Sequence, residues 1–513
     1  MVCDVNSIDS NVTGLSIAEE ECPKILPVVP GDVDWYTQEP NSYSNFGTVV
    51  NTVAREPINP LRQNKKGTTT SIEAAGGFNS DMTQNNMDRL LQGFFFNDAF
   101  EKYNLLPFNG TANPTLDVEV GNGIYNVTST LATSIYASDL VKATGFASSA
   151  NNGTFLVEAV TVAELDTDNT ASVLDAAPAA NANIRVVGHE FASGDLAATI
   201  SSGTLVLTSA AKDISELGLR VGEWIFIGGD AVGTQFTNGT GYARVSALTT
   251  TTITCDKSTG LVTADTGAAK TIRIFFGTYQ RNGTQLSEII YRSYQLERTL
   301  GNDTVGVQSE IMIGAYANEF ALKIPSEAKL EVDLSYIALD SEVRTGTQGL
   351  KAGNRISALA EEAYNTSTDV VRINMSPVTA SLTPTPQFAF VTEANFNIAN
   401  GVKLNKAVGV AGGIGVATGN FVVSGSVTAY FQTVAALSAV RNNVDITIDA
   451  IFAKSNGGMI FDVPLLILSS AGVNVTKDDP ITIPLEQFAA ENSFGYTFSY
   501  CNMHYLPTIA MPA

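Results

Sequence analysis

The sequence predicts a mainly β protein in which one fold occurs twice, and three observations lead to this prediction. Most of the chain alternates apolar and polar residues in short runs rich in Val, Ile, Thr, Phe and Tyr. Gly, Asn, Asp and Pro separate these runs at intervals of about 8–12 residues, as in all-β proteins. Helical patterns are few and short, and a strand followed by a short helix occurs at two distant places.

The length and charge of the chain limit what it can do. Its 513 residues exceed what one hydrophobic core usually serves, so about two to four domains are expected. The net charge of −22 argues against binding nucleic acid through phosphate contacts. The two histidines, His189 and His504, lie far apart, and no cysteines have zinc-ligand spacing. We therefore predict no enzyme activity and no catalytic, cofactor-binding or metal-binding residue.

The cysteines and the N-terminus predict folding in a reducing compartment. Cys3, Cys22, Cys255 and Cys501 are too sparse for a disulfide framework, so free thiols are expected, with a Cys3–Cys22 bond as the alternative. The first residues carry acid instead of the Lys or Arg of a secretory signal, and no run of about 18 apolar residues follows. We therefore expect a soluble protein that is not exported by the usual route and contacts no membrane.

The first copy of the fold contains a strand from Ser71 that leads into a short helix. Asp81 is predicted as the helix N-cap because Gln84 follows three residues later. The apolar residues of the helix recur at steps of three and four: Met87, Leu90, Leu91, Phe94 and Phe95. This stripe predicts that the helix packs on a sheet. Further strands follow after residue 277, with a hairpin that carries Pro325.

Residues 109–276 interrupt this copy and contain a repeat of their own. Asn152-Gly153-Thr154 returns as Asn238-Gly239-Thr240, and Ile184-Arg185-Val186 returns as Ile272-Arg273-Ile274, at offsets of 86 and 88 residues. The agreement of the offsets predicts two small tandem β modules. In each module the Asn-Gly pair is predicted to form a tight hairpin turn. We expect this inserted block to have a core of its own, to project outward and to be dispensable for assembly.

The second copy repeats the order of strand and helix. A strand is predicted from Phe421 to Gln432, and a helix near Thr433. Its predicted apolar face contains Val434, Leu437 and Val440. In the next strand, apolar residues from Val444 to Phe452 alternate with Asp445, Thr447 and Asp449, which predicts one core face and one water-exposed face. A hairpin with Pro464 then matches the one with Pro325.

These patterns divide the chain into six parts. They are an N-terminal arm at 1–29, the first copy at 30–108 and 277–345 around the inserted modules at 109–276, a linker at 346–374, and the second copy at 375–513.

At several segments the chain resembles the tail tube proteins of long-tailed, non-contractile bacteriophages. The matching segments are residues 55–60 (REPINP) with Arg62-Gln63 and Lys65-Lys66-Gly67, residues 74–79 (AAGGFN), residues 294–298 (YQLER), and the strand VVSGSVTAYF from Val422. The strand entry at residues 221–224 (VGEW) also resembles β modules that are inserted in such proteins. The segments lie in the same order as in the family.

The resemblance implies a structural virion protein of two β-sandwich or barrel folds, each with a short helix, plus the inserted pair of modules. Copies of the chain would form rings with a continuous inner β-barrel, and the rings would stack into the tube that delivers the genome. Because two folds lie in one chain, we predict trimeric rings with pseudo-sixfold symmetry over hexameric ones. The implied partners are the tape measure, terminator and distal tail proteins. DNA would pass without specific binding, and assembly would take place in the host cytoplasm.

Two groups of charged residues are candidate functional residues. Arg55, Arg62, Lys65 and Lys66 form the one basic cluster of an acidic chain, and we predict that they dock onto an acidic surface of the adjacent ring. A solvated loop is the alternative. Asp445 and Asp449 are predicted to line the lumen, where carboxylates would keep DNA phosphates from adhering.

Two other functions compete with this hypothesis. A cell-surface or S-layer-like β array shares the acidic, Ala- and Thr-rich composition, but it needs a secretion signal. A carbohydrate-active enzyme needs paired carboxylates and aromatic platforms, and the chain has two tryptophans. The glycine-rich run at 409–415 lacks the Lys-Ser/Thr of a phosphate-binding loop, so a hairpin loop is expected there.

Overall fold

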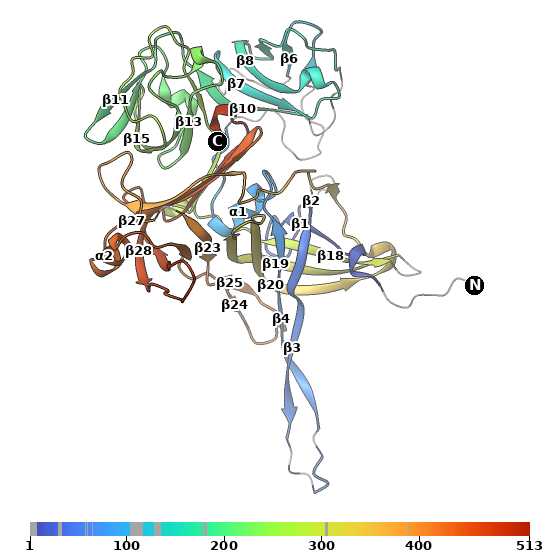
Figure 1. Cartoon of the computed structure of the whole chain (residues 1–513). Coiled ribbons are helices and arrows are strands. Elements are labelled where there is room, and N and C mark those ends of the chain that lie inside the picture. The colour runs from blue at the N-terminus through green and yellow to red at the C-terminus, as the bar shows by residue number, and fades with distance from the viewer. Residues whose placement is uncertain are drawn as a thin grey trace. The chain divides into compact units, whose positions relative to one another are not determined.

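The computed structural model of the chain is shown in Figure 1. It describes residues 8–28, 33–56, 58, 60–63, 65–102, 116–127, 135–176, 178, 182–302, 306–388 and 390–512. The chain forms two compact units: unit 1 holds residues 1–97, 287–363 and 394–425, and unit 2 holds residues 98–286, 364–393 and 426–513. The mainly β prediction is confirmed. No helix within the described ranges has the length and apolar character needed to cross a membrane.

Unit 1 contains a sheet whose hydrogen-bonded order is β21-β2-β1-β18-β19-β20-β4-β3. Its strands are β1 (Gly14–Glu19), β2 (Asp34–Gln38), β3 (Pro40–Arg55), β4 (Lys65–Asp81), β18 (Tyr294–Asn302), β19 (Val307–Ile324), β20 (Glu331–Arg344) and β21 (Asn354–Ile356). All neighbours are antiparallel except β2 and β21. A further strand, β23 (Val391–Ala399), pairs with β19 through residues 394–399.

Helix α1 (Asp88–Phe95) packs on this sheet as its apolar stripe predicts. Leu90, Leu91, Phe94 and Phe95 are buried. The ring of Phe94 lies 5.8 Å from that of Phe320 and 5.5 Å from that of Tyr336. The predicted start at Asp81 is wrong, because Asp81 is the last residue of β4 and pairs with Glu331 of β20, so the helix begins seven residues later.

Two segments that looked like connections in the sequence contribute strands to unit 1. The predicted N-terminal arm contains β1, which pairs with β18 along its whole length. The predicted linker contains β21, and the side chain of Tyr364 in the same stretch is fully buried. Short strands such as these have their backbone hydrogen bonds satisfied by partners that are distant in sequence, so the local pattern does not reveal them.

The inserted block lies in unit 2, and twelve described strands form its sheet. They are β5 (Asp117–Val118), β6 (Ile124–Asn126), β7 (Asp139–Thr144), β8 (Gly153–Val160), β9 (Glu164–Thr167), β10 (Asn183–Glu190), β11 (Ala197–Ser201), β12 (Thr204–Thr208), β13 (Trp224–Ile227), β14 (Gly241–Leu248), β15 (Thr252–Ser258) and β16 (Arg273–Phe275). From the central pair β10–β16, the order runs β7-β8-β9-β6-β5 on one side and β13-β14-β15-β12-β11 on the other. The tight Asn-Gly turns are wrong, because Asn152 and Asn238 end longer loops that lead into β8 and β14.

The other strands of unit 2 follow the order β22-β27-β28-β29-β26. Their bounds are β22 (Val370–Pro377), β26 (Val422–Tyr430, of which the last five residues belong to unit 2), β27 (Ile446–Lys454), β28 (Gly457–Ala471) and β29 (Thr482–Ala489). Beside the first half of β28 lies β30 (Ser499–Met503), which also pairs with β17 (Thr278–Arg281). Helix α2 (Ala435–Arg441) follows β26.

The inserted block shares a hydrophobic core with these strands. Trp224 and Tyr242 of the block are buried in one cluster with Ile451, Ile460 and Cys501. The backbone N–H of Trp224 donates to Cys501 Sγ at 3.4 Å, and the Tyr242 hydroxyl donates to the carbonyl of Ala510 at 3.0 Å. The block also has a core of its own, which includes Val141, Ile184 and Ile253, so the expected core is confirmed, but the block is not packed separately from the rest of unit 2.

Two details of the second copy differ from expectation. The buried residues of α2 are Ala436 and Ala439, whereas Val434 is exposed. Pro464 lies within β28, not at a hairpin turn. The pairing register of β27 with β28 shifts there, which is where a strand accepts a residue that lacks an N–H. The strand at Phe421–Gln432 is confirmed as β26, with Val423 and Val427 buried.

Candidate assembly hairpin

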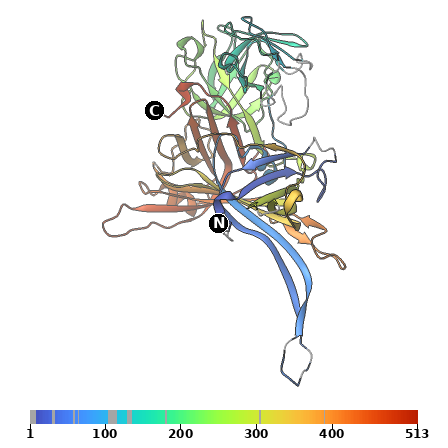
Figure 2. The same cartoon turned by 90° about the vertical axis from the view of Figure 1, so that its right-hand side faces the viewer.

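The hairpin of β3 and β4 is the most protruding element of unit 1 (Figures 1 and 2). Strand β4 pairs with β20 only through residues 74–81. Residues 65–73 of β4 pair with β3 and with no other described strand. The distal part of the hairpin, residues 48–73, is therefore a two-stranded ribbon with no sheet beneath it. Such a ribbon is marginally stable by itself, so its length suggests that it is covered in an assembly.

Apolar side chains are exposed along the distal hairpin. They are Val49, Val50, Val53, Ile58 and Leu61. Val49 and Val50 are consecutive residues and so point to opposite faces of the ribbon, and neither face is solely polar. Apolar side chains exposed together on a projecting element are typical of a protein interaction site. The sequence analysis missed these residues, although the run from Gly47 to Ala54 has no polar alternation on either face.

The predicted basic cluster occupies the tip of this hairpin. Arg55, Arg62, Lys65 and Lys66 are all exposed, and no ion pair links any of them to another described side chain. Arg55 lies directly opposite Lys65 in the ladder, an arrangement of like charges that is unfavourable without a counter-charge. Glu56 is the one acidic residue between positions 55 and 66. The structure thus brings the four cations together at a projecting tip.

The base of the hairpin is anchored in unit 1. Lys406 forms an ion pair with Glu73, and the backbone N–H of Ile72 donates to the carbonyl of Ala411 at 2.7 Å. Ala411 belongs to the loop between β24 (Lys403–Asn405) and β25 (Gly415–Ala417), so the glycine-rich run forms a hairpin loop as predicted. These contacts reach no farther than Ile72, so the distal strands project beyond them.

The two aspartates predicted to line a lumen lie in different environments. Asp445 is exposed and precedes β27. Asp449 is buried and accepts hydrogen bonds from Arg372, whose Nε lies at 2.7 Å and Nη2 at 2.8 Å. Thr447 is also buried, so the predicted water-exposed face of this strand is wrong. Only Asp445 has the exposure that a lumen-lining residue requires.

The face of β27 is covered by a buried ionic network in unit 2 that the sequence analysis missed. Arg244 of β14 donates from Nη1 to Asp462 at 3.1 Å and to the Thr447 hydroxyl at 3.3 Å. Its Nε and Nη2 donate to Asp256 at 3.0 and 2.7 Å. Burial raises the pKa of Asp462 to about 6, although the Arg244 charge acts in the opposite direction. The network joins the inserted block to β27 and β28.

The cysteines and histidines have structural surroundings. Cys22 is exposed, whereas Cys255 and Cys501 are buried, and all three are free thiols. Cys3 lies outside the described residues, so the alternative bond to Cys22 stays open. Both histidines are buried: His189 Nδ1 lies 2.8 Å from Asp139 Oδ1, and burial with nearby cations holds the pKa of His504 well below its usual value.

Comparison with known proteins gives one family. A family model described as "Phage tail tube protein" matches residues 10–494 of the chain, and this range includes the hairpin and most of both units. No curated protein matches the chain.

Proposed function

Because the chain belongs to the phage tail tube protein family, we propose that its copies assemble into stacked rings that form the tube for genome delivery. The chain is a structural component of the virion tail, and the family implies homo-oligomeric stacking. The observation that carries the proposal is the projecting β3–β4 hairpin with its exposed valines and basic tip.

The hairpin has the chemistry needed to join one ring to the next. Its four cations would meet a protein surface with an excess of carboxylates, since the chain as a whole has a net charge of −22. Opposite charges guide docking and set its register, whereas burial of the exposed valines supplies most of the favourable free energy. An isolated solvated loop would need neither a long ribbon nor apolar side chains on both of its faces.

The direct test is electron microscopy of the purified protein. We expect hollow tubes with a regular axial repeat. Monodisperse monomers at every salt and protein concentration, together with the absence of the chain from tail tubes of its virion, would contradict the proposal.

Charge reversal at the tip should weaken stacking. In Lys65→Glu/Lys66→Glu, two docking cations become anions facing an acidic surface, so we expect assembly to need about tenfold more protein, which corresponds to about 1.4 kcal/mol. Lys270→Glu/Arg441→Glu makes the same change of net charge elsewhere and should assemble normally. Pelleting of tubes over a concentration series measures the threshold. Equal thresholds for the two variants would leave the tip without a docking role.

We also infer that the chain contains two copies of one fold. The copy in unit 1 has the order β1-β18-β19-β20-β4-β3, with α1 between β4 and β18. The second copy has the order β22-β27-β28-β29-β26-β23, with α2 between β26 and β27. The order of the elements along the chain is the same in both. This agreement of strand order and helix position supports a duplication, which neither strand length nor local pattern alone would require.

Two copies per chain predict trimeric rings. A ring of six fold copies has pseudo-sixfold symmetry when three chains close it. Image averaging of tubes, or mass measurement of single rings, should give three chains per ring. Six chains per ring would mean that one of the two copies does not take part in the barrel.

The remaining assignments follow from this proposal. Asp445 would face the lumen, where its carboxylate repels DNA phosphates. The tube would belong to a non-contractile tail assembled in the host cytoplasm. Its ends would contact the tape measure, terminator and distal tail proteins.

A further inference from the structure

Strand β19 shows how one copy of the fold joins the next. One edge of β19 pairs with β20 from Ser309 to Lys323. The other edge pairs first with β18, as far as Ala315, and then with β23 from Glu319 to Ile324. Strand β23 precedes β26 in the second copy. The second half of this edge therefore receives a strand from the other copy.

Strand β28 is the counterpart of β19 in the second copy. It pairs with β27, which corresponds to β18, but it has no partner that corresponds to β23. Along one edge it pairs with β27 as far as Leu466. On the opposite edge it pairs with β29 from Leu466, and the bridge between Asn474 and Thr482 continues this contact. Pairing with β27 ends at Leu466, and beyond this residue the same edge of β28 has no partner among the described strands. By its place in the strand order, the open stretch at residues 469–475 corresponds to residues 319–324 of β19.

Strand β3 is the counterpart of β23 and has an open edge. It pairs with β4 on one side, as β23 pairs with β26, and no other described strand lies along its second side. The segment that corresponds to residues 394–399 of β23 is residues 42–48. The chain therefore has two unpaired strand edges. One is the acceptor edge at residues 469–475, and the other is the edge of β3 at residues 42–48.

Each open stretch has one register irregularity, between Ser44 and Gly47 and between Leu468 and Ser470, but neither has charged residues or prolines. Residues 469–475 (SSAGVNV) and residues 42–48 (SYSNFGT) contain no charged residue and no proline. Charges, prolines or covering loops normally prevent such edges from pairing with other chains. Small side chains at Ser469, Ser470 and Gly472 also let a second backbone approach closely.

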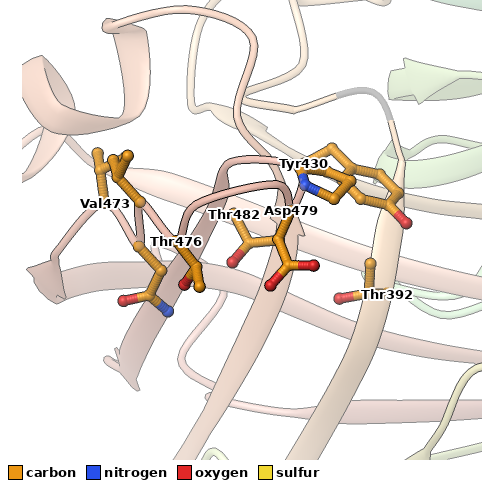
Figure 3. Close-up of a pocket in the computed structure, with 9 residues that line it drawn as sticks. Thr392, Tyr430, Val473, Thr476, Asp479 and Thr482 are labelled. Atoms are coloured by element: carbon orange, nitrogen blue, oxygen red, sulfur yellow. The ribbon is translucent and has the colours of Figure 1, made fainter.

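An open hollow in unit 2 lies beside the loop that follows β28, on the side of β29 and β26 (Figure 3). Val473 and Thr476 line one part of it, and Tyr430 and Thr392 line another. Val475 at its rim is exposed. The hollow therefore lies on the β29 side of β28, opposite to the open edge, and an added strand would leave it uncovered.

We propose that residues 42–48 of β3 pair antiparallel with residues 469–475, the end of β28 and the segment that follows it, in a neighbouring copy of this chain. The pairing of β23 with β19 is the template for its direction and place. This assignment rests on the proposed function, because it names the edges through which the rings close. The contact between chains in a ring then repeats the contact between the two copies in one chain.

Disulfide trapping tests the pairing. In a Cys3→Ser/Cys22→Ser background, Ser470→Cys is combined in turn with Ser42→Cys, Ser44→Cys and Thr48→Cys, and assembled tubes are treated with a diazene oxidant that accepts the two thiol hydrogens. Neighbouring strands bring Cα atoms to about 4.5–5.5 Å, within the range that a disulfide needs. We expect covalent trimers for at least one pair, and none for the control Ser470→Cys with Thr199→Cys of β11.

Well-formed tubes without covalent trimers would overturn the pairing and leave the proposed function intact, and so would a disulfide confined to single chains. An absence of tubes from the unsubstituted protein would contradict the proposed function itself. Amide hydrogen exchange on unsubstituted tubes gives a second reading that needs no cysteine. Residues 42–48 and 469–475 should both gain at least tenfold protection over monomer. Unchanged exchange in either segment would also overturn the pairing.

Discussion

Removal of the distal hairpin should abolish tube formation while the monomer still folds. The change replaces residues 51–71 with Asn-Gly, which forms a tight turn between Val50 and Ile72, two residues that already face each other in the ladder. It removes the basic tip and Val53, Ile58 and Leu61 in one step. The contacts of Ile72 and Glu73 at the base remain.

The physical reason is that the deleted residues contact chiefly one another. Their loss takes little buried surface from unit 1, so the thermal midpoint of the monomer should stay within a few degrees of the original value. Val53, Ile58, Leu61 and the four cations would no longer be available to a second ring. Electron microscopy and thermal unfolding check the two halves of the prediction. Tubes of normal length would mean that stacking uses another surface, and an unfolded monomer would mean that the hairpin supports the fold.

Substitution of Arg244 by Met should destabilise unit 2 by about 3–5 kcal/mol, the usual cost of leaving a buried charge without its partner. Asp462 is fully buried and Arg244 is almost so, and they lie 3.1 Å apart. In Arg244→Met, the Asp462 carboxylate loses its cation but stays away from water. Denaturant unfolding followed by the fluorescence of the buried Trp224 measures the change. A loss of unfolding free energy below about 1 kcal/mol would mean that the network contributes no more than an exposed ion pair does.

Two controls separate the charge effect from a packing effect. The double variant Arg244→Met/Asp462→Leu removes both charges and should recover much of the lost stability. Arg441→Met removes an exposed cation from the end of α2 and should change stability by less than about 0.5 kcal/mol. A double variant as unstable as the single one would attribute the loss to packing around residue 244.

The stability of Arg244→Met should also depend on pH. Burial already raises the pKa of Asp462 to about 6, and removal of Arg244, which lowers it, raises that pKa further. A carboxyl whose pKa is higher in the folded than in the unfolded state binds more protons when folded, so stability falls as the pH rises between these two values. The difference in stability between the variant and the original protein should therefore be larger at pH 8 than at pH 5.

Local patterns were sufficient where a residue's neighbours determine its structure. The apolar stripe of α1 and the alternation along β26 are read correctly because helix and strand periodicities are properties of consecutive residues. The helix start at Asp81 is predicted wrongly, because pairing with Glu331 keeps Asp81 in a strand. The basic cluster was found in the sequence, but the exposed valines beneath it were not, since apolar residues in a strand are ordinarily buried.

By itself, the sequence determined that this protein is mainly β, that a short helix follows each of two distant strands, and that its positive charge gathers at one segment. Only the tertiary structure decided which polar residues meet water. Thr447 and Asp449 alternate with apolar residues as an exposed face would, yet Arg244, about two hundred positions earlier, covers that face, and Arg372 neutralises Asp449. A strand's alternation specifies two faces, but what packs on each face depends on segments that the local pattern does not contain.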